Sequence, residues 1–170
     1  HNGRIVPRIR TKKLRKPKGF VARQPGECLA FDTIERVRDG CRRYIVTTLD
    51  CFDRFALALG TSSHTSAPPA AMLSATQACY PNPLGASLTD NGSEFQKHFD
   101  AALSRAGIPH WHTFPRTPRM NAHVERFNRT IQEEFIDHHE SLLFSDLPAF
   151  NRLLAEYLVW YNTVRPHRSL

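Results

Sequence analysis

Residues 28–59 read CLAFDTIERVRDGCRRYIVTTLDCFDRFALAL and contain three short runs that are rich in apolar and β-branched residues. The turn-forming pair Asp39-Gly40 separates the first two runs, and Asp53-Arg54 precedes the third. Short strands joined by tight turns predict an antiparallel meander. The three expected strands cover residues 28–34, 43–50 and 55–59.

Helices and strands alternate after this meander. Apolar residues at helical spacing predict the helices, and prolines 68 and 69 are tolerated in the first turn of the first one. Three antiparallel strands followed by helices and two parallel strands predict an α/β protein with an RNase H-like fold, in which helices flank a five-stranded mixed sheet. The remaining elements are a helix over 66–80, a strand over 86–89, a helix over 93–106, a strand over 108–114, a helix over 121–138 and a last helix capped by Ser145.

The positive charge is concentrated near the N-terminus. The 170 residues carry a formal charge of +7, of which residues 1–30 hold a net +8 and residues 31–170 a net −1. We therefore divide the chain into a basic arm, residues 1–26, and a core, residues 27–170. Such an arm gains affinity for nucleic acid by releasing counterions from phosphates, although a solvated linker is the alternative interpretation.

Several functional classes are disfavoured by composition. No apolar run approaches the ~18 residues that a membrane helix needs, and the basic N-terminus has no apolar signal core. The four cysteines (28, 41, 51 and 79) lack zinc-ligand spacing. We expect them to be buried or half-buried free thiols in a reducing cytoplasm.

Asp32 and Asp90 are the first two candidates for chemistry. Asp32 lies inside an apolar strand, where a carboxylate is costly to bury unless a cation or hydrogen-bond donors compensate. An edge or outward position is its structural alternative. Asp90 follows the strand over 86–89, and ligands commonly bind beyond the carboxyl ends of parallel strands. Asp90-Asn91-Gly92 is also a strong turn sequence, so both interpretations stand.

Glu125 is the third candidate, beside the apolar stripe of the helix over 121–138. An exposed ion pair with Arg129, four residues later, is the alternative. Asn121, Asn128 and Gln132 form a nearby polar strip suited to nucleic acid or water. Mg²⁺ takes hard oxygen ligands and keeps several waters, so three carboxylates with substrate phosphates suffice for a two-ion site.

Five blocks carry a family resemblance: FDTI at 31–34, RYIVTTLDCFDRF at 43–55, LTDNGSEF at 88–95, NAHVERFNRTI at 121–131 and YNTVRPHRSL at 161–170. Together they resemble the catalytic core of the DDE recombinases, which comprise retroviral integrases and related bacterial insertion-sequence transposases. The resemblance implies an RNase H-like fold, two Mg²⁺ or Mn²⁺ ions held by Asp32, Asp90 and Glu125, and cleavage and transfer of DNA strands.

The chain departs from the family pattern at two points. One residue fewer than usual lies between Asp90 and Glu125, a difference that the loop over 116–120 absorbs, and Ala122 stands where many relatives have glycine. No zinc module or complete helix-turn-helix precedes the arm. We therefore expect the chain to be part of a longer protein that acts at the bacterial nucleoid.

DNA, as transposon ends and target, is the expected partner, bound by a homo-oligomer. Arg126 and Arg129 are candidates for phosphate contact near Glu125, with structural ion pairs as the alternative interpretation. For the tail 165–168 we favour a structural role over DNA contact. Three other functions remain open: an RNase H-like nuclease without strand transfer, an idle DNA-binding remnant of a mobile element, and a zinc-binding structural domain. The expected DNA contacts are Lys12, Lys13, Arg15, Lys16, Asn91, Gly92, Arg126 and Arg129.

Overall fold

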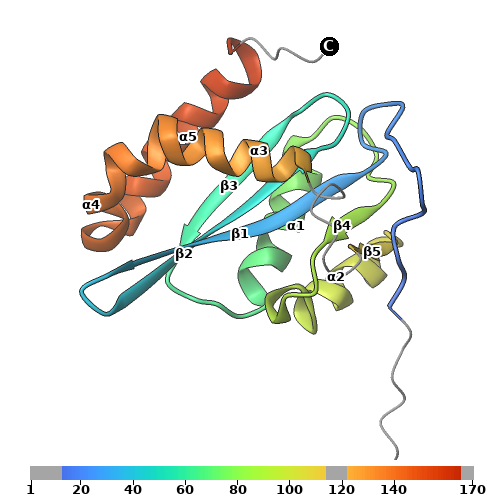
Figure 1. The fold of residues 1–170 in the computed structure, drawn as a ribbon, viewed down its shortest axis with the longest axis horizontal. Helices are drawn as coiled ribbons and strands as arrows, with labels where there is room; N and C mark the ends of the chain where they lie inside the picture. Colours follow the sequence, from blue (N-terminus) through green and yellow to red (C-terminus); the bar gives the residue numbers. More distant parts are fainter. Residues whose placement is uncertain (1–12, 114–121, 166–170) are drawn as a thin grey trace, which may run out of the picture.

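A central mixed sheet organises the protein (Figure 1). The computed structural model describes residues 13–113 and 122–165. Its five strands lie in the order β3-β2-β1-β4-β5. The β1–β2 and β2–β3 pairs are antiparallel, whereas β4 pairs in parallel with both β1 and β5, which confirms the predicted sheet. The strands are β1 (Leu29–Arg38), β2 (Cys41–Asp50), β3 (Ala56–Thr61), β4 (Ser87–Thr89) and β5 (His110–His112).

Side chains that alternate along β1 face two different hydrophobic layers. Leu29 and Phe31 pack with helices α1 and α2 on one face. Ala30 and Ile34 face the helices α3 to α5 on the other, and Figure 1 shows the two helix groups on opposite sides of the sheet. Asp32 has the same parity as Ala30 and Ile34, so its side chain belongs to the face that α3 covers. The helices are α1 (Ala67–Cys79), α2 (His98–Ala106), α3 (Ala122–Ile131), α4 (Asp137–Ser145) and α5 (Leu147–Thr163).

The hairpin of β1 and β2 extends beyond the predicted strands. Its ten-residue strands stay paired up to Arg38 and Cys41, where Asp39 and Gly40 turn with φ of +49° and +73°. The exposed end lacks the apolar alternation used to predict strands, because few of its side chains reach a core. A backbone ladder can continue without buried side chains on either face, so the apolar pattern predicted strands that are too short.

Two helix predictions are corrected. The single helix expected over 93–106 is a short 3₁₀ turn, η1 (Ser93–Phe95), followed by α2, because Lys97 takes a left-handed φ of +45° between them. The helical path from α3 to α4 is continuous through a π-helical turn, η3 (Gln132–Ile136). Ser145 is the last residue of α4, and Asp146 caps α5 instead by accepting a hydrogen bond from the N–H of Ala149. A carboxylate competes well for this position.

Helix α5 seals the outer edge of the sheet. The side-chain amide of Asn151 accepts from the N–H of Gly60 at 2.8 Å and donates to its carbonyl at 2.9 Å. Asn162 pairs in the same way with both backbone groups of Ala56, at 2.8 Å each. These two asparagines satisfy the outward-facing backbone groups of Ala56 and Gly60 on edge strand β3, which would otherwise be open to pairing with another chain.

The described part of the basic arm runs along the opposite edge. Arg15 forms an isolated parallel bridge with His112 of β5, and the N–H of His112 donates to the carbonyl of Leu14 at 2.9 Å. Phe20 packs edge-on against Trp111. Residues 13–20 are therefore attached to the sheet, next to the end of β4 that carries Asp90.

The described residues include no helix that is long and apolar enough to cross a membrane. All four cysteines are free thiols. Cys28 is buried and Cys51 half-buried as expected, but Cys41 and Cys79 are exposed, which corrects that part of the prediction. Cys41 opens the exposed end of the hairpin, and Cys79 ends α1 on its outer side.

Candidate active site

Strand register brings Asp32 and Asp90 side by side. Leu29 and Ala30 of β1 pair in parallel with Ser87 and Leu88 of β4. Continuing this register by two residues sets Asp90 opposite Asp32, just where β4 ends. Residues in register on neighbouring strands point to the same face of a sheet. The two carboxylates therefore share one face at the carboxyl end of β4.

Two hydrogen bonds hold the half-buried Asp32 carboxylate. Oδ1 accepts from the N–H of Thr33 at 2.9 Å, and Oδ2 accepts from the side-chain amide of Asn128 at 2.8 Å. The amide oxygen of Asn128 in turn accepts from the hydroxyl of Thr47 at 2.8 Å. Because Thr47 lies opposite Asp32 on β2, this chain of bonds sets the orientation of the Asn128 amide and joins α3 to the sheet.

Asn128 is itself buried, at 7% exposure. We expected Asn128 in a polar strip suited to nucleic acid or water, and the structure corrects this. Asn128 lies on the face of α3 that packs against the sheet, because the helix approaches the sheet closely at this point. The spacing of three residues from Glu125 could have indicated the arrangement, since residues three apart share a helix face.

Asp90 combines the two interpretations of its sequence. Its Oδ1 accepts from the N–H of Gly92 at 2.7 Å, the turn bond that Asp-Asn-Gly predicts. Its main-chain carbonyl is held by the Thr89 hydroxyl at 2.8 Å and lies 3.1 Å from Nδ1 of His112. The carboxylate itself is exposed and keeps acceptor capacity for a ligand.

Glu125 lies in the first turn of α3 and is exposed. It forms no ion pair with Arg129 within the described part of the chain, so the helical ion pair considered above is not what holds it. Its charge acts on Asp32 instead. The helix is anchored beneath it by Val124 and Phe127, both buried in the core.

Asp32 is the electrostatic centre of the site. Burial raises the pKa of Asp32 to about 6, the N–H of Thr33 opposes this shift, and the negative charges of Asp90, Glu125 and Glu94 add to it. Four carboxylates therefore lie within electrostatic range of one another. Their mutual repulsion is relieved by a cation, and hard carboxylate oxygens are the ligands that Mg²⁺ and Mn²⁺ take.

The acids fit such an ion by type and charge without converging on one point. Among the described residues, no three His, Cys, Asp or Glu side chains lie close enough to hold an ion as they stand. Electrostatic coupling extends further than direct ligation, so both observations hold together. The site is a loose carboxylate cluster rather than a closed cage, which suits a metal whose remaining ligands are water and substrate oxygens.

Glu94 is the member of this cluster that sequence reasoning missed. It lies half-buried in η1, four residues after Asp90. A Cβ atom at Gly92 would lie 2.5 Å from Oε2 of Glu94 and 2.9 Å from Oδ1 of Asp90, so both carboxylates flank this glycine. The block LTDNGSEF places Glu94 four residues after Asp90, which could have indicated its role, but we assigned Glu94 to an expected helix over 93–106.

Asp50 shows why a buried acid need not be a metal ligand. It is fully buried at the end of β2, and its two oxygens accept from the N–H groups of Gly26, Phe52 and Asp53 and from the hydroxyl of Tyr80. These donors satisfy the carboxylate without a cation. Asp50 ties the start of the core to the β2–β3 turn and is structural.

The residues expected to contact DNA lie in different surroundings. Lys13 donates to the side-chain oxygen of Asn91 at 3.4 Å, which places one arm cation next to Asp90. Arg15 is bonded to the carbonyl of Thr113 at 2.5 Å, and Lys16 lies 5.7 Å from the Phe20 ring centre, so both are tied to the β5 edge. Gly92 lies between the two carboxylates described above, Arg126 and Arg129 are exposed on α3, and Lys12 lies outside the described residues.

Arg54 is a further cation near the site that sequence reasoning did not single out. It occupies the β2–β3 turn with a φ of +70° and donates to the carbonyl of Cys51. Burial lowers the pKa of His123 at the start of α3, and the positive charges of Arg54, Lys16 and Arg126 lower it further. These cations therefore lie near the N-terminus of α3, the helix that carries Glu125 in its first turn.

The terminal block is structural where it is described. Tyr161 packs edge-on against Phe127, and Asn162 holds β3. Arg165 binds Glu134 through both of its carboxylate oxygens, with the shortest contact at 2.7 Å, which confirms the favoured role for this residue. Residues 166–168 lie outside the described part of the chain.

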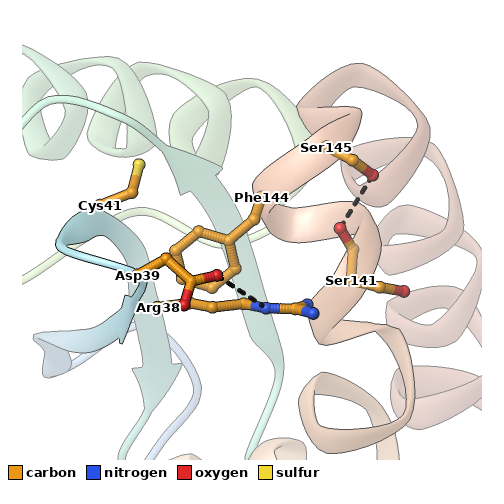
Figure 2. Close-up of a pocket in the computed structure, with 6 residues that line it drawn as sticks. All are labelled: Arg38, Asp39, Cys41, Ser141, Phe144 and Ser145. Carbon is orange, nitrogen blue, oxygen red and sulfur yellow. Dashed lines mark hydrogen bonds and ion pairs between the residues drawn. The ribbon is translucent and has the colours of Figure 1, made fainter.

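A separate hollow of about 380 Å³ lies at the hairpin end (Figure 2). Its walls are the tip of the β1–β2 hairpin and α4. Arg38 at its rim lies six positions along β1 from Asp32, a distance of about 20 Å. The hollow is therefore remote from the acids. Its lining residues are Arg38, Asp39, Cys41, Ser141, Phe144 and Ser145.

The sequence matches the integrase core domain family twice, over residues 22–118 and over residues 106–170. No curated protein matches it by sequence. Among solved structures, a chain of the simian T-cell lymphotropic virus intasome in complex with PP2A regulatory subunit B56 gamma is similar, with 19% identity and a TM-score of 0.72 over 94% of this chain and 57% of that chain. The HTLV-2 integrase catalytic core domain in complex with magnesium, in its trimeric form, has 18% identity and a TM-score of 0.65 over 85% and 90%. The present chain thus spans 57% of the intasome chain.

Proposed function

Because this chain belongs to the integrase core domain family, we propose that it is the catalytic core of a DNA transposase or integrase that cleaves and joins DNA strands. The observation that carries the proposal is the cluster around Asp32. A half-buried carboxylate is held in place by Asn128 and surrounded by the charges of Asp90, Glu125 and Glu94. Such a concentration of negative charge at the carboxyl end of β4 favours the binding of divalent cations.

Asp32, Asp90 and Glu125 are the residues that would hold two Mg²⁺ or Mn²⁺ ions. When bound, the two ions would supply positive charge that aligns an attacking oxygen and stabilises the leaving oxygen of a phosphodiester. Asn128 would position Asp32, since its amide is itself fixed by Thr47. Glu94 would add negative charge on the Asp90 side and strengthen cation binding.

The proposed reaction has two phosphoryl transfers. In the first, a water oxygen attacks a phosphorus at a transposon end, the bond from phosphorus to the 3′ oxygen breaks, and a 3′-hydroxyl is freed. In the second, that hydroxyl attacks a target phosphodiester, forming one phosphorus–oxygen bond and releasing another 3′-hydroxyl. The chain needs no side-chain nucleophile for either step, and its acids serve to bind and orient.

DNA would reach this site along a basic path. Lys13 next to Asn91 would lead from the arm to Asp90, and Arg126 and Arg129 would flank Glu125. Lys12, Arg15 and Lys16 would add phosphate contacts on the β5 side. Transposon ends and target DNA are the proposed substrates, bound by a homo-oligomer at the bacterial nucleoid. The HTLV-2 core has been described in dimeric and trimeric forms, which supports an assembly of this kind.

The test compares wild type with Asp32→Asn, Asp90→Asn and Glu125→Gln. Calorimetric titration with Mn²⁺ measures ion binding, and joining of a 3′-hydroxyl DNA end to a second duplex measures strand transfer. We expect each variant to weaken Mn²⁺ binding and to abolish joining. Glu156→Gln, an exposed change on α5, is the matched control and should behave as wild type.

Two outcomes would overturn the proposal. If all three variants bind Mn²⁺ as wild type does, the metal site is elsewhere or absent. If wild type hydrolyses DNA but never joins strands, the protein is a nuclease of this fold.

A further inference from the structure

Cys28 and Cys51 face each other at the end of the β1–β2 ladder. Leu29 pairs with Asp50, and the next positions outward are the two cysteines. The N–H of Cys51 donates to the carbonyl of Cys28 at 2.9 Å, so the ladder continues through them. Directly opposed residues on neighbouring antiparallel strands have Cα atoms about 4.5–5.5 Å apart, within the ~4.4–6.8 Å that a disulfide spans.

The two thiols also lie in one environment. Cys28 is fully buried in the core beneath α3 to α5, and Cys51 packs half-buried against the same cluster. Cys51 is the more exposed residue of the two, so we expect a small reagent to reach it first. Its carbonyl is bound by Arg54, so the turn holds it in place.

The environment assigns different roles to the two sulfurs. A hydrogen bond between the thiols and burial raise the pKa of Cys28. The same bond lowers the pKa of Cys51. Burial and the negative charge of Asp50 oppose this lowering, whereas the positive charges of Lys16 and Arg54 support it. A thiolate is the reactive form of cysteine, whereas its protonated neighbour can resolve the oxidised product.

We propose that Cys28 and Cys51 are a redox-active dithiol that a hydroperoxide converts into an intramolecular disulfide. The Cys51 thiolate attacks the terminal peroxide oxygen, so that a sulfur–oxygen bond forms and the oxygen–oxygen bond breaks. The sulfenic acid appears, and hydroxide leaves from hydrogen peroxide or alkoxide from an organic hydroperoxide. The Cys28 sulfur then attacks the Cys51 sulfur. The disulfide forms, the sulfur–oxygen bond breaks, and the released hydroxyl leaves with the Cys28 proton as water.

The cross-link would close the hairpin that carries Asp32. It joins two positions that the ladder already pairs, so little backbone movement is needed. Closing this loop restricts the unfolded chain, and we expect the oxidised protein to melt several degrees above the reduced protein.

The first experiment uses the unchanged chain. Protein treated with hydrogen peroxide is unfolded in guanidinium chloride, so that buried thiols also react, and is then alkylated with iodoacetamide, digested without reductant and analysed by mass spectrometry. We expect Cys41 and Cys79 to carry the alkyl group and the peptides of Cys28 and Cys51 to be linked, with the loss of two hydrogen masses reversed by dithiothreitol. The proposal is overturned if Cys28 and Cys51 are both alkylated after peroxide treatment.

Matched variants separate this pair from the other thiols. A Cys41→Ser/Cys79→Ser protein should still lose both free thiols, because the two exposed cysteines take no part. Cys51→Ser in that background should keep its single thiol, whereas Cys28→Ser should stop at the sulfenic acid, detected by dimedone. Equal peroxide reactivity in the two single-thiol proteins would contradict the assigned roles. Neither metal nor DNA is present in these assays, so their outcome does not depend on the proposed function.

Discussion

Asn128 is a buried amide that would orient one ligand of the proposed metal site from outside that site. Its donor group holds Asp32, and its acceptor oxygen is satisfied by Thr47. Replacing it with alanine leaves the hydroxyl of Thr47 without this partner and frees the Asp32 carboxylate to rotate. Outer residues that orient metal ligands typically affect ion affinity strongly.

We predict that Asn128→Ala weakens Mn²⁺ binding about 10- to 100-fold, with a stability loss of about 1–2 kcal/mol. Calorimetric titration measures the first effect and urea unfolding the second. Gln132→Ala is the control, because within the described residues the Gln132 side chain donates to the backbone carbonyl of Asn128, at 2.9 Å, and not to Asp32. Wild-type ion affinity in Asn128→Ala would show that Asp32 does not depend on this amide.

Gly92 is constrained by its neighbours and not by its backbone. Its φ of −56° suits any residue, but an added Cβ would lie 2.5 Å from the Glu94 carboxylate and 2.9 Å from that of Asp90. Both side chains are free to turn away, so the fold should tolerate the change while the acids shift.

Gly92→Ala is therefore predicted to reduce Mn²⁺ affinity and strand joining at least about tenfold, while the melting temperature stays within a few degrees of wild type. Gly107→Ala should show the reverse, since Gly107 has a φ of +67° in open space and lies away from the acids. A Gly92→Ala protein with unchanged ion affinity would separate Glu94 from the site.

At the scale of elements, the π-helical turn η3 is joined to the end of α5. The Arg165 guanidinium binds both oxygens of Glu134, and the Tyr157 hydroxyl donates to Oε2 at 2.8 Å. Burial alone would raise the pKa of Glu134, but the hydrogen bonds from Arg165 and Tyr157 lower it below its ordinary value. The contact joins the helical run that carries Glu125 to the helix that covers β3.

This contact should make stability depend on pH. A carboxyl group with a lowered folded-state pKa stabilises the fold above its unfolded pKa, and the contribution is lost as pH falls through the folded value. We predict that Arg165→Gln melts below wild type near pH 6 and that the difference shrinks as Glu134 is protonated below about pH 4. Thermal melts across this range provide the measurement. A difference that stayed constant with pH would mean that Arg165 acts by packing on Tyr161, whose ring it overlies at 5.5 Å.

At the scale of the whole molecule, the charge is divided between the arm and a nearly neutral core. The bases of residues 1–12 are Arg4, Arg8, Arg10 and Lys12, and none of the three acids lies near them in sequence. Arm cations that contact phosphates release counterions, so their contribution depends on salt. The core, by contrast, gathers carboxylates around Asp32 of the central strand β1 and the carboxyl end of β4.

Deleting residues 1–12 should therefore weaken DNA binding at low salt and lower the slope of log K against log salt by up to about 3 to 4, roughly 0.9 per lost phosphate contact. Fluorescence anisotropy at several salt concentrations measures the slope. Mn²⁺ binding should be unaffected, which provides the internal control. An unchanged slope would indicate that these residues do not touch DNA.

Much of this fold was readable from local patterns. Alternating apolar residues identified the strands near Asp32, and the turn sequence after residue 89 located the end of β4 and Asp90. Helical spacing placed Glu125 beside a packed face. These features depend on neighbouring residues and on backbone preferences, so most strands and helices and three candidate acids could be predicted before any contact was known. The family resemblance, and not a local pattern, grouped the three acids into one expected site.

The tertiary structure decided which side chains meet. The parallel register of β1 with β4 sets Asp90 opposite Asp32, α3 brings Asn128 onto that carboxylate, and the charge of Glu94 in η1 acts on the same group. The same packing opposes Cys28 and Cys51. Contacts of this kind join residues far apart in the chain, and burial and strand register set their geometry, so no local pattern encodes them. Sequence alone therefore indicated most helices and strands and three candidate acids, whereas tertiary packing alone determined the electrostatics that surround Asp32.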